Sequence, residues 1–589
     1  MTVTIYSSDL TGETTLSGAG GGQLYVLQTD VTLSSNLRGF VGTTDIDLVI
    51  RGLVAADGVG IDFDVGVTAA LRSTVTVEAG AAVYSAGGEA VRMVGHTGTL
   101  SNHGTLEAFA TAAVRVEHEG PSNDSHVFNS GSIIGHNNAG LVLAGSSVRL
   151  TDRVYVDNDG TISGATNGVQ VDGATVDFHN SGSVAATGSG RGFSILSTGA
   201  QLTNTGSING FIGVYVEPGS IGGLTLRNDG IIAAAGSSAV FFDEDVLGVI
   251  SNTGTMVGSV VTKGSTDVLV NTGTIQGAVS LGDGNDTFDG RGGTVTGIVQ
   301  GGNGRDTFYV DSAVSLFGGD DDDTFFVYDA NADISGGAGT GDLVFAWVDT
   351  ELDSTTENLR LQGGADLNGT GNRLDNLISG NGGSNVLIGA GGNDIIITLQ
   401  GENTLYGGSG DDLLSGESER ETFYGGSGND TVFGLEGADI IRGSGGADTL
   451  EGGDGDDIIR GGQGADELRG GDGDDWLMGG KGRDFMEGGD GADTFVYTRI
   501  TDGPDSLTNA ERVQDFIRGE DRIDLSAMAR DMTFLGTAGF SATGDAEVRF
   551  ATQSGFTIVR VDKDGDGSAD FFLRLNGVAT AMTEDDFIL

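Results

Sequence analysis

Aspartates recur at a fixed interval between glycine-rich turns in the second half of the chain. Residues 452 to 478 read GGDGDDIIRGGQGADELRGGDGDDWLM, which is three consecutive nonapeptides of the form G-G-x-G-x-D-x-U-x, where U is apolar. Glycine turns expose backbone carbonyls and aspartate adds a charged oxygen, and Ca²⁺ prefers six to eight oxygen ligands. The pattern therefore predicts calcium binding at the sixth position of each nonapeptide.

Fourteen nonapeptides in this register run from residue 371 to residue 496, and every eighth position is apolar. This period predicts a turn followed by a short strand whose eighth side chain enters a thin core. Asn376, Asn385, Asn403 and Glu421 replace aspartate at the sixth position, so we expect weaker or empty sites there. The other sixth positions are predicted metal ligands: Asp394, Asp412, Asp430, Asp439, Asp448, Asp457, Asp466, Asp475, Asp484 and Asp493.

Two further groups of aspartates are candidate calcium ligands. LGDGNDTFD, GGNGRDTFY and GGDDDDTFF are degenerate copies of the repeat and supply Asp286, Asp306 and Asp323. Near the end of the chain, DKDGDGSAD forms a D-x-D-x-D-G-like pattern that suggests one more Ca²⁺ site. A Gly-Asp hairpin turn explains that loop equally well. Its candidate ligands are Asp562, Asp564, Asp566 and Asp570.

The first half of the chain contains a second, looser repeat. NSGSV, NTGSI, NDGII and NTGTM begin at Asn180, Asn204, Asn228 and Asn252, 24 residues apart, with short alternating segments between them. We predict a parallel β-helix in which each turn Asn ladders with its neighbours one coil away. The fold class is all-β: a right-handed parallel β-helix that continues into a calcium-binding parallel β-roll. Its predicted domains are a β-helix (1–278), transitional coils (279–370), the β-roll (371–496) and a small C-terminal β domain (497–589).

Composition excludes several classes of function. The net charge is −55, from 29 Lys and Arg against 84 Asp and Glu, so nucleic acid and anionic membrane surfaces are poor partners. There is no cysteine for disulfides or thiolate chemistry. No apolar run is long enough to insert into a membrane. The first residues lack the basic and apolar regions of a secretory signal peptide, so an export signal is expected elsewhere.

The nonapeptide array resembles the RTX, or hemolysin-type, calcium-binding β-roll. In that family two nonapeptides make one coil, and stacked turns bind Ca²⁺ through carbonyls and the sixth-position Asp. Residues 497–589, with the acidic and then apolar end DFIL, resemble the C-terminal domain of serralysin-type secreted metalloproteases. Residues 1–278 are similar to adhesin-like β-helices of bacterial surface proteins. The resemblance implies a Gram-negative source, export unfolded through a type I secretion transporter that reads the C-terminus, and folding outside on Ca²⁺.

Catalytic signatures are sparse. None of the six histidines lies in His-Glu-x-x-His, so the protease zinc site of that class is missing. Glu117, His118, Glu119 and His126 form a sequence cluster that suits either a transition metal or a loop leaving a coil. An extracellular polysaccharide lyase or epimerase that uses the β-helix groove is the alternative enzyme. Its scattered candidate residues are Arg191, Tyr215, Asp243, Glu244 and Asp245.

The sequence thus favours a secreted, non-catalytic, calcium-stabilised solenoid with a structural, adhesive or surface-layer role. Its expected partners are multiple Ca²⁺ ions, the secretion transporter, and either further copies of itself through head-to-tail self-assembly or surface glycans. We expect it outside the cell or at the cell surface.

Overall fold

The computed structural model describes most of the chain as short parallel β-strands. It describes all residues except 1, 6–22, 28–30, 33–36, 39–45, 57, 65–72, 96, 119–123, 146–152, 244, 503–509 and 579–580. The chain divides into two compact units. Unit one comprises Met1–Asp323 and Asn331–Asp333, and unit two comprises Thr324–Ala330 and Ile334–Leu589.

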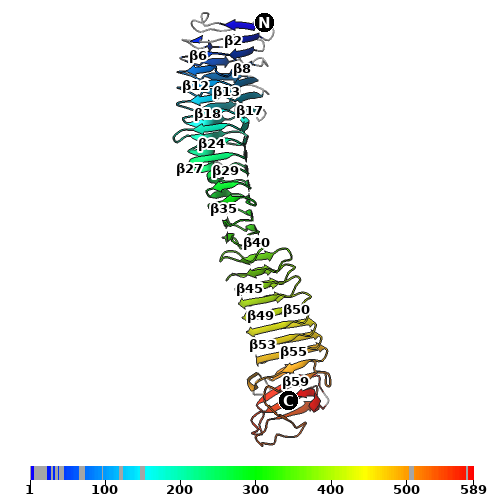
Figure 1. Ribbon diagram of the computed structural model, residues 1–589. Coiled ribbons are helices and arrows are strands. Elements are labelled where there is room, and N and C mark those ends of the chain that lie inside the picture. Colours follow the sequence, from blue (N-terminus) through cyan, green and yellow to red (C-terminus); the bar gives the residue numbers. More distant parts are fainter. Residues whose placement is uncertain are drawn as a thin grey trace. The chain divides into compact units, whose positions relative to one another are not determined.

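Unit one is a parallel β-helix in which each strand pairs with a strand one coil away (Figure 1). Its strands form three ladders. The first ladder contains β1 (Thr2–Ile5), β2 (Gln23–Leu27), β5 (Ile46–Ile50), β8 (Ser73–Val77), β11 (Gly98–Asn102), β14 (Ser125–Asn129), β17 (Arg153–Asn158), β20 (Thr175–Asn180), β23 (Ala200–Asn204), β26 (Leu224–Asn228), β28 (Gly248–Asn252), β30 (Val268–Asn271), β33 (Thr287–Asp289) and β36 (Thr307–Val310).

The other two ladders share β27 (Ile231–Phe242) and β29 (Thr255–Val261), which turn the corner without a break. The second ladder also contains β3 (Val31–Thr32), β6 (Leu53–Ala56), β9 (Ala82–Ser85), β12 (Thr105–Ala108), β15 (Ser132–Gly135), β18 (Thr161–Gly164), β21 (Ser183–Ala186), β24 (Ser207–Gly210), β31 (Thr274–Gln276) and β34 (Thr294–Val295). The third also contains β4 (Leu37–Arg38), β7 (Ile61–Asp64), β10 (Val91–Gly95), β13 (Val114–His118), β16 (Leu141–Gly145), β19 (Asn167–Asp172), β22 (Arg191–Leu196), β25 (Ile212–Val216), β32 (Val279–Asp283), β35 (Val299–Asn303) and β37 (Ser315–Asp320).

A buried column of asparagines closes one corner of unit one, as the sequence predicts. Asn102, Asn129, Asn158, Asn180, Asn204, Asn228, Asn252 and Asn271 each end a strand of the first ladder and are at most 2% exposed. Nδ2 of each of the first seven donates to Oδ1 of the next asparagine at 2.7 Å, and Nδ2 of Asn271 donates to the carbonyl oxygen of Thr294. An amide is both donor and acceptor, so the column satisfies itself without any ion.

Unit two begins as a two-ladder solenoid with one coil every two nonapeptides. One ladder contains β38 (Thr324–Val327), β40 (Leu343–Ala346), β42 (Asn358–Leu361), β44 (Leu377–Ser379), β46 (Ile395–Ile397), β48 (Leu413–Ser415), β50 (Thr431–Glu436), β52 (Thr449–Asp454), β54 (Glu467–Asp472), β56 (Phe485–Asp490) and β58 (Glu511–Val513). The other contains β41 (Thr350–Glu351), β43 (Asn368–Thr370), β45 (Val386–Gly391), β47 (Thr404–Ser409), β49 (Thr422–Ser427), β51 (Ile440–Gly445), β53 (Ile458–Gly464), β55 (Trp476–Gly482), β57 (Thr494–Val496), β59 (Arg522–Asp524) and β64 (Phe587–Ile588).

The predicted core of this array is confirmed. All fourteen eighth-position side chains, from Ile378 to Phe495, are fully buried. The side chains on either side of each point outward, as in the exposure pattern of β49 and β54. One buried side chain per strand makes a core too thin to stabilise the array by itself.

The C-terminal end of unit two is closed by antiparallel strands. β61 (Glu547–Gln553), β62 (Phe556–Asp562) and β63 (Phe571–Asn576) form a meander, β60 (Thr533–Phe534) pairs with β61, and β63 pairs with β58. The second ladder ends with the two residues of β64. These elements thus pair with the last coil strands of both ladders, and the expected head-to-tail self-assembly stays a prediction. None of the helices described here has the length and apolarity needed to cross a bilayer.

The asparagine column yields a prediction about unit one. Replacing Asn204 with Ala leaves the Nδ2 of Asn180 without its acceptor and the Oδ1 of Asn228 without its donor, at about 1–3 kcal/mol for each buried unsatisfied group. Urea unfolding, followed by hydrogen exchange of peptides from 175 to 271, should show the loss. Gln201→Ala, on the exposed face of the same strand, should change little. Equal midpoints for the two variants would contradict this role of the column.

Candidate metal centre

Sixth-position carboxylates of the array stack in two columns, one on each side of the core. In each column, Oδ1 of the aspartate accepts the backbone N–H of the sixth residue one coil earlier, at 2.7–3.0 Å. Asp430 N–H donates to Asp448, for example, and Asp457 N–H to Asp475. The same bond joins the pairs 394/412, 412/430, 421/439, 439/457, 448/466, 466/484 and 475/493.

For ten of these carboxylates the second oxygen has no hydrogen-bond partner among the described residues. It is enclosed, and the side chains are at most 2% exposed. A buried charged oxygen without a partner costs several kcal/mol unless a cation or donor meets it. The orphaned atoms are Oδ2 of Asp394, Asp412, Asp430, Asp439, Asp448, Asp457, Asp466, Asp475 and Asp493, together with Oε2 of Glu421.

Glycine at the first position of every nonapeptide except the one that begins at Thr398 leaves space beside this oxygen. A Cβ on Gly452 would collide with Oδ2 of Asp457 and with the carbonyl oxygen of Gly470, one coil later. Gly407, Gly443, Gly461 and Gly470 are each flanked by the equivalent two oxygens, Oδ2 of the sixth-position aspartate and the carbonyl oxygen of the glycine one coil later. A carboxylate and a carbonyl therefore converge on the gap, which is the oxygen-rich donor set that Ca²⁺ prefers. The described residues fit calcium.

Burial alters the acidity of these groups in the absence of a cation. Desolvation raises the pKa of Asp457 and Asp466 to about 7 and of Asp475 to about 8, and nearby carboxylates add to the rise. Glu421 follows the same trend, with its pKa raised to about 8 by burial and by Asp439. The fold thus disfavours the charged form of these groups unless a positive charge lies beside it.

In three coils the sixth position is asparagine, which carries no buried charge and needs no cation. The Nδ2 atoms of Asn376, Asn385 and Asn403 donate to the carbonyl oxygens of Glu357, Leu367 and Gly401 at 3.0, 2.9 and 2.7 Å. In Asn376 and Asn385 the amide oxygen lies where the aspartates have an orphaned oxygen, and it accepts the N–H groups of Asn372 and Asn381 at 2.7 and 2.9 Å. These hydrogen bonds give a physical reason for the expectation that these coils bind calcium weakly or not at all.

The carboxylate columns extend beyond the residues that the sequence suggested. In unit one, Asp286 N–H donates to Asp306 and Asp306 N–H to Asp323, so the three predicted residues form one column. Asp267 precedes them: it accepts the N–H of Gly248, its Oδ2 has no partner among the described residues, and burial raises its pKa to about 7. The sequence analysis missed Asp267, although a buried Leu269 follows it in the D-x-U spacing.

In unit two the columns end on Glu511 and Asp521, which the sequence analysis also missed. Asp484 N–H donates to Glu511 Oε2 at 3.1 Å, and Asp493 N–H to Asp521 Oδ1 at 3.0 Å. The insertions after residue 496 hide the period, but Gly519, Asp521 and the buried Ile523 keep the G-x-D-x-U signal.

Comparison with known proteins agrees with this geometry. Residues 369–589 match the family model described as Peptidase M10 serralysin C terminal. This part of the chain is similar to the C-terminal region of serralysins and carries RTX-type repeats. It fits a secreted calcium-binding repeat protein.

No curated protein matches the chain. Among solved structures, the chain is similar to the solution structure of the AlgE6R3 subunit from the Azotobacter vinelandii mannuronan C5-epimerase. The identity is 34% over 26% of this chain and 79% of that chain, with a TM-score of 0.20.

The serralysin-type region holds one more acidic cluster, in the loop between β62 and β63. Ligand oxygens of Asp562, Asp564 and Asp570 lie within 4.8 Å of one another, whereas Asp566 is not part of this group. Both oxygens of Asp562 already accept N–H groups, from Gly565 and Gly567, at 2.8 and 2.7 Å. The loop is a hairpin connection, and calcium binding there stays a prediction.

Of the enzyme candidates, the structure brings three together and separates others. Tyr215 donates to Asp243 at 2.7 Å, and Arg191 lies 3.5 Å over the Tyr215 ring. Asp245 instead accepts from Ser265, and Glu244 lies outside the described residues.

The proposed transition-metal cluster is not assembled by its described members. Glu117 lies on the third ladder and pairs with Arg92 and Arg115. His126 lies on the first ladder and stacks on Tyr155. Glu119 and the side chain of His118 are outside the described residues.

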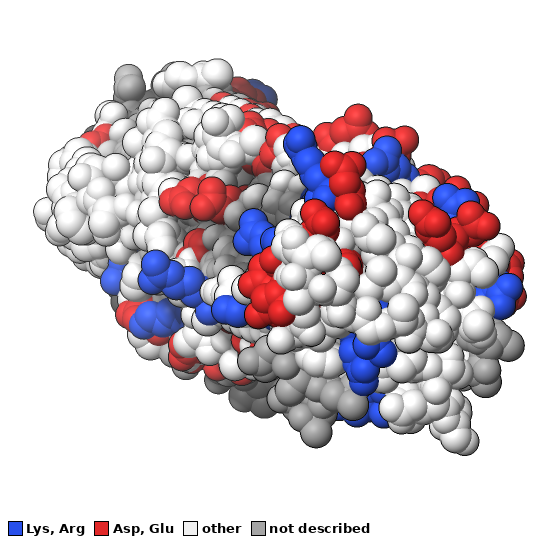
Figure 2. Space-filling view, turned by 90° about the horizontal axis from the view of Figure 1, so that it is seen from below, with Lys and Arg blue, Asp and Glu red and all other residues white. Residues whose placement is uncertain are grey.

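Acidic and basic side chains lie side by side at several places on the surface visible in Figure 2. The column aspartates add little to any surface because they are at most 2% exposed. Part of the large negative charge therefore lies inside the turns, where it is available to a bound cation and not to a basic partner.

Neighbouring aspartates provide a matched test of the columns. Asp457→Asn keeps an oxygen that accepts Asp439 N–H but removes the buried negative charge. Asp456→Asn removes an exposed negative charge, from a carboxylate that accepts Asp474 N–H. Calorimetric titration should show at least one fewer calcium ion for Asp457→Asn and an unchanged number for Asp456→Asn. In chelator, Asp457→Asn should be the more stable of the two. The same calcium stoichiometry for both variants would contradict the assignment.

Proposed function

We propose that the protein is a secreted solenoid that folds outside the cell when calcium fills its carboxylate columns, and that it has a structural, adhesive or surface-layer role. The orphaned second oxygens of the sixth-position aspartates carry this proposal. They supply a repeated, buried, negatively charged site that the protein itself leaves without a donor. The ligands we assign are the sixth-position aspartates of the array, together with Asp286, Asp306 and Asp323.

Mass action makes the dependence on calcium steep. Each site with free Ca²⁺ at about ten times its dissociation constant adds about 1.4 kcal/mol, and about ten sites add roughly 14 kcal/mol. This is comparable to the whole free energy of unfolding of an ordinary domain. Where calcium is scarce the same term vanishes, which suits a chain that crosses the cell envelope unfolded.

The C-terminal tail supports export through a type I transporter of a Gram-negative bacterium. In the folded chain Asp586 is 1% exposed and accepts the N–H groups of Gly519 and Thr583. Phe587 packs on Phe534 at 5.4 Å between ring centroids, and Ile588 accepts Leu525 N–H. The transporter can read these residues only before the C-terminal domain folds.

A polysaccharide lyase or epimerase is the second candidate, because Arg191, Tyr215 and Asp243 lie together on one face. Burial and the bond to Asp243 raise the pKa of Tyr215 to about 12, which makes its phenol a poor base at neutral pH. Lys263 already pairs with Asp243 at 2.6 Å. These contacts favour the non-catalytic role. Incubation with alginate and pectin, followed by unsaturated-uronate absorbance, separates the two functions.

Chelation should unfold the chain selectively. In excess EGTA we expect peptides from 425 to 496 to lose their hydrogen-exchange protection. Peptides from 175 to 271, held by the asparagine column, should keep theirs. Restoring millimolar Ca²⁺ should restore protection. Full protection of 425–496 in EGTA would contradict calcium-dependent folding.

Removal of the tail should retain the protein in the cell. We expect a chain that lacks its last few dozen residues to accumulate inside, because the transporter loses its signal. As a control, deletion of one whole coil, residues 443–460, preserves the tail and the register and should still permit export. Immunoblots of cells and medium measure both. A tail-less chain in the medium would contradict the export route.

A further inference from the structure

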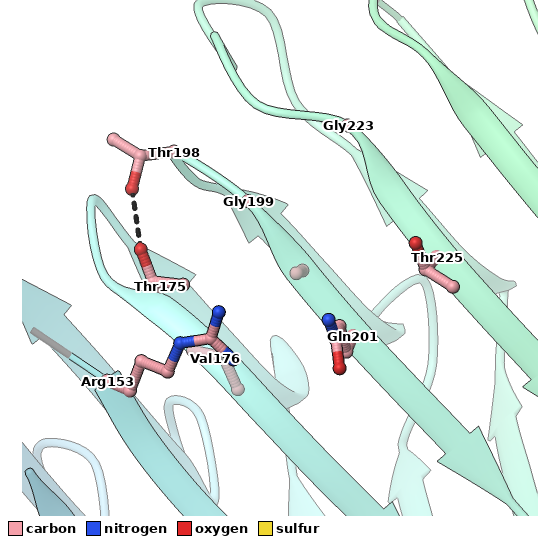
Figure 3. A pocket seen from close by; sticks show the side chains of 9 residues that line it. Arg153, Thr175, Val176, Thr198, Gly199, Gln201, Gly223 and Thr225 are labelled. Atoms are coloured by element: carbon pink, nitrogen blue, oxygen red, sulfur yellow. Dashed lines mark hydrogen bonds between the residues drawn. The ribbon is translucent and has the colours of Figure 1, made fainter. Parts of the chain in front are cut away.

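A cleft of about 260 Å³ lies in unit one where four strands of the first ladder begin. Its lining includes Arg153 of β17, Thr175 of β20, Gln201 of β23 and Thr225 of β26. Figure 3 shows Arg153, Gln201 and Thr225 on neighbouring strands, with the hydroxyls of Thr175 and Thr198 hydrogen-bonded beside them at 3.0 Å. The volume is slightly below the usual range for ligand pockets, ~300–1,000 Å³. It therefore suits one ring-sized group.

Arg153 differs from the other described arginines of unit one. It is exposed, and it forms no ion pair within the described residues, in a chain of net charge −55. The others each pair with a carboxylate: Arg51, Arg92, Arg115, Arg191, Arg227, Arg291 and Arg305. Among the described residues no carboxylate pairs with this guanidinium, so it is available to an external anion. Its planar fork matches a carboxylate with two hydrogen bonds.

An aromatic row continues from the cleft on the same face. Tyr155 follows Arg153 by two residues on β17, so both side chains point outward. Its ring stacks on His126 at 4.9 Å, and His126 stacks on Phe128 at 6.0 Å. Phe128 is 39% exposed. Stacking on His126 closes one face of the Tyr155 ring, so the row offers apolar ring edges beside the polar cleft.

We propose that this face binds a hexuronate residue of a linear acidic polysaccharide. The carboxylate lies on Arg153, the sugar hydroxyls meet Gln201, Thr175 and Thr225, and the next sugar lies against the outer edge of the Tyr155 ring. The inference extends the adhesive role proposed above and rests on it only for the extracellular location. It does not depend on the calcium columns, because the cleft lies among coils closed by the asparagine column.

Nearby acids set the orientation of the ligand. Asp177 is the register partner of both Tyr155 and Gln201, and it lies 3.4 Å from His179, which also contacts Asp157 at 3.3 Å. A sugar carboxylate is repelled from this trio and attracted to Arg153. The hydroxyls of the sugar are the groups that suit Asp177 as hydrogen-bond acceptor.

Calorimetry on the calcium-loaded full chain tests the proposal with trigalacturonate, which is too short for calcium to gel. We expect binding of the trimer and none of a neutral galactose trimer. Arg153→Gln should weaken binding roughly tenfold or more, since it removes a charged pair of hydrogen bonds. Tyr155→Ala should weaken it several-fold. Circular dichroism checks that each variant stays folded.

Arg227→Gln is the matched control, because it removes the same charge from β26 outside the cleft lining. It should leave affinity within about twofold. Equal losses in Arg153→Gln and Arg227→Gln would assign binding to overall charge and overturn the proposal. Absence of binding to the wild-type chain, or equal binding of the neutral trimer, would overturn it as well. Calcium-independent folding would contradict the proposed function and leave this result unaffected.

Discussion

A buried carboxylate stacked above another carboxylate is the constraint on which the nonapeptide array depends. One oxygen of each aspartate accepts a backbone N–H from the neighbouring coil and so fixes the register of the stack. The other oxygen faces a gap lined by a carbonyl, with no donor among the described residues. Like charges repeated along a column repel each other strongly at low dielectric. A divalent cation between them reverses the sign of that interaction.

Two kinds of buried polar column join successive coils in this chain. Asparagine columns join coils through an amide that donates and accepts, so they are complete in themselves. Aspartate columns keep the accepting oxygen and lack the donor. The change occurs within unit one, where Asn252 still bonds to Asn271 while Gly248 N–H already bonds to Asp267. On the proposed function, the source of stability therefore changes along the sequence from the amide column itself to bound calcium.

Much of this arrangement could be predicted from the sequence because a repeat determines its own neighbours. Once the period is known, each sixth-position side chain must stack on the sixth-position side chain of the next coil, and each eighth-position side chain on the next eighth. Asp457 and Ile459 follow that rule. The same rule explains the asparagine column. Glu511 and Asp521 escaped prediction because insertions break the period, although the columns continue across them.

Other features depend on details that no period encodes. Arg153 and Gln201 line one cleft because the register places Arg153 beside Thr175, and Gln201 beside Asp177 two residues further along the same strand. That none of the described carboxylates pairs with Arg153 depends on which side chains lie around it in space. The antiparallel closure by β61, β62 and β63 likewise follows from packing over the end of a solenoid.

Crystallography of the calcium-loaded protein, with data collected for the anomalous signal of calcium, tests the central claim most directly. The account predicts peaks within about 2.3–2.6 Å of Oδ2 of Asp430, Asp448, Asp457 and Asp475, and none beside Asn385 or Asn403. Peaks absent from both columns, with water or a protein donor at those oxygens, would contradict it.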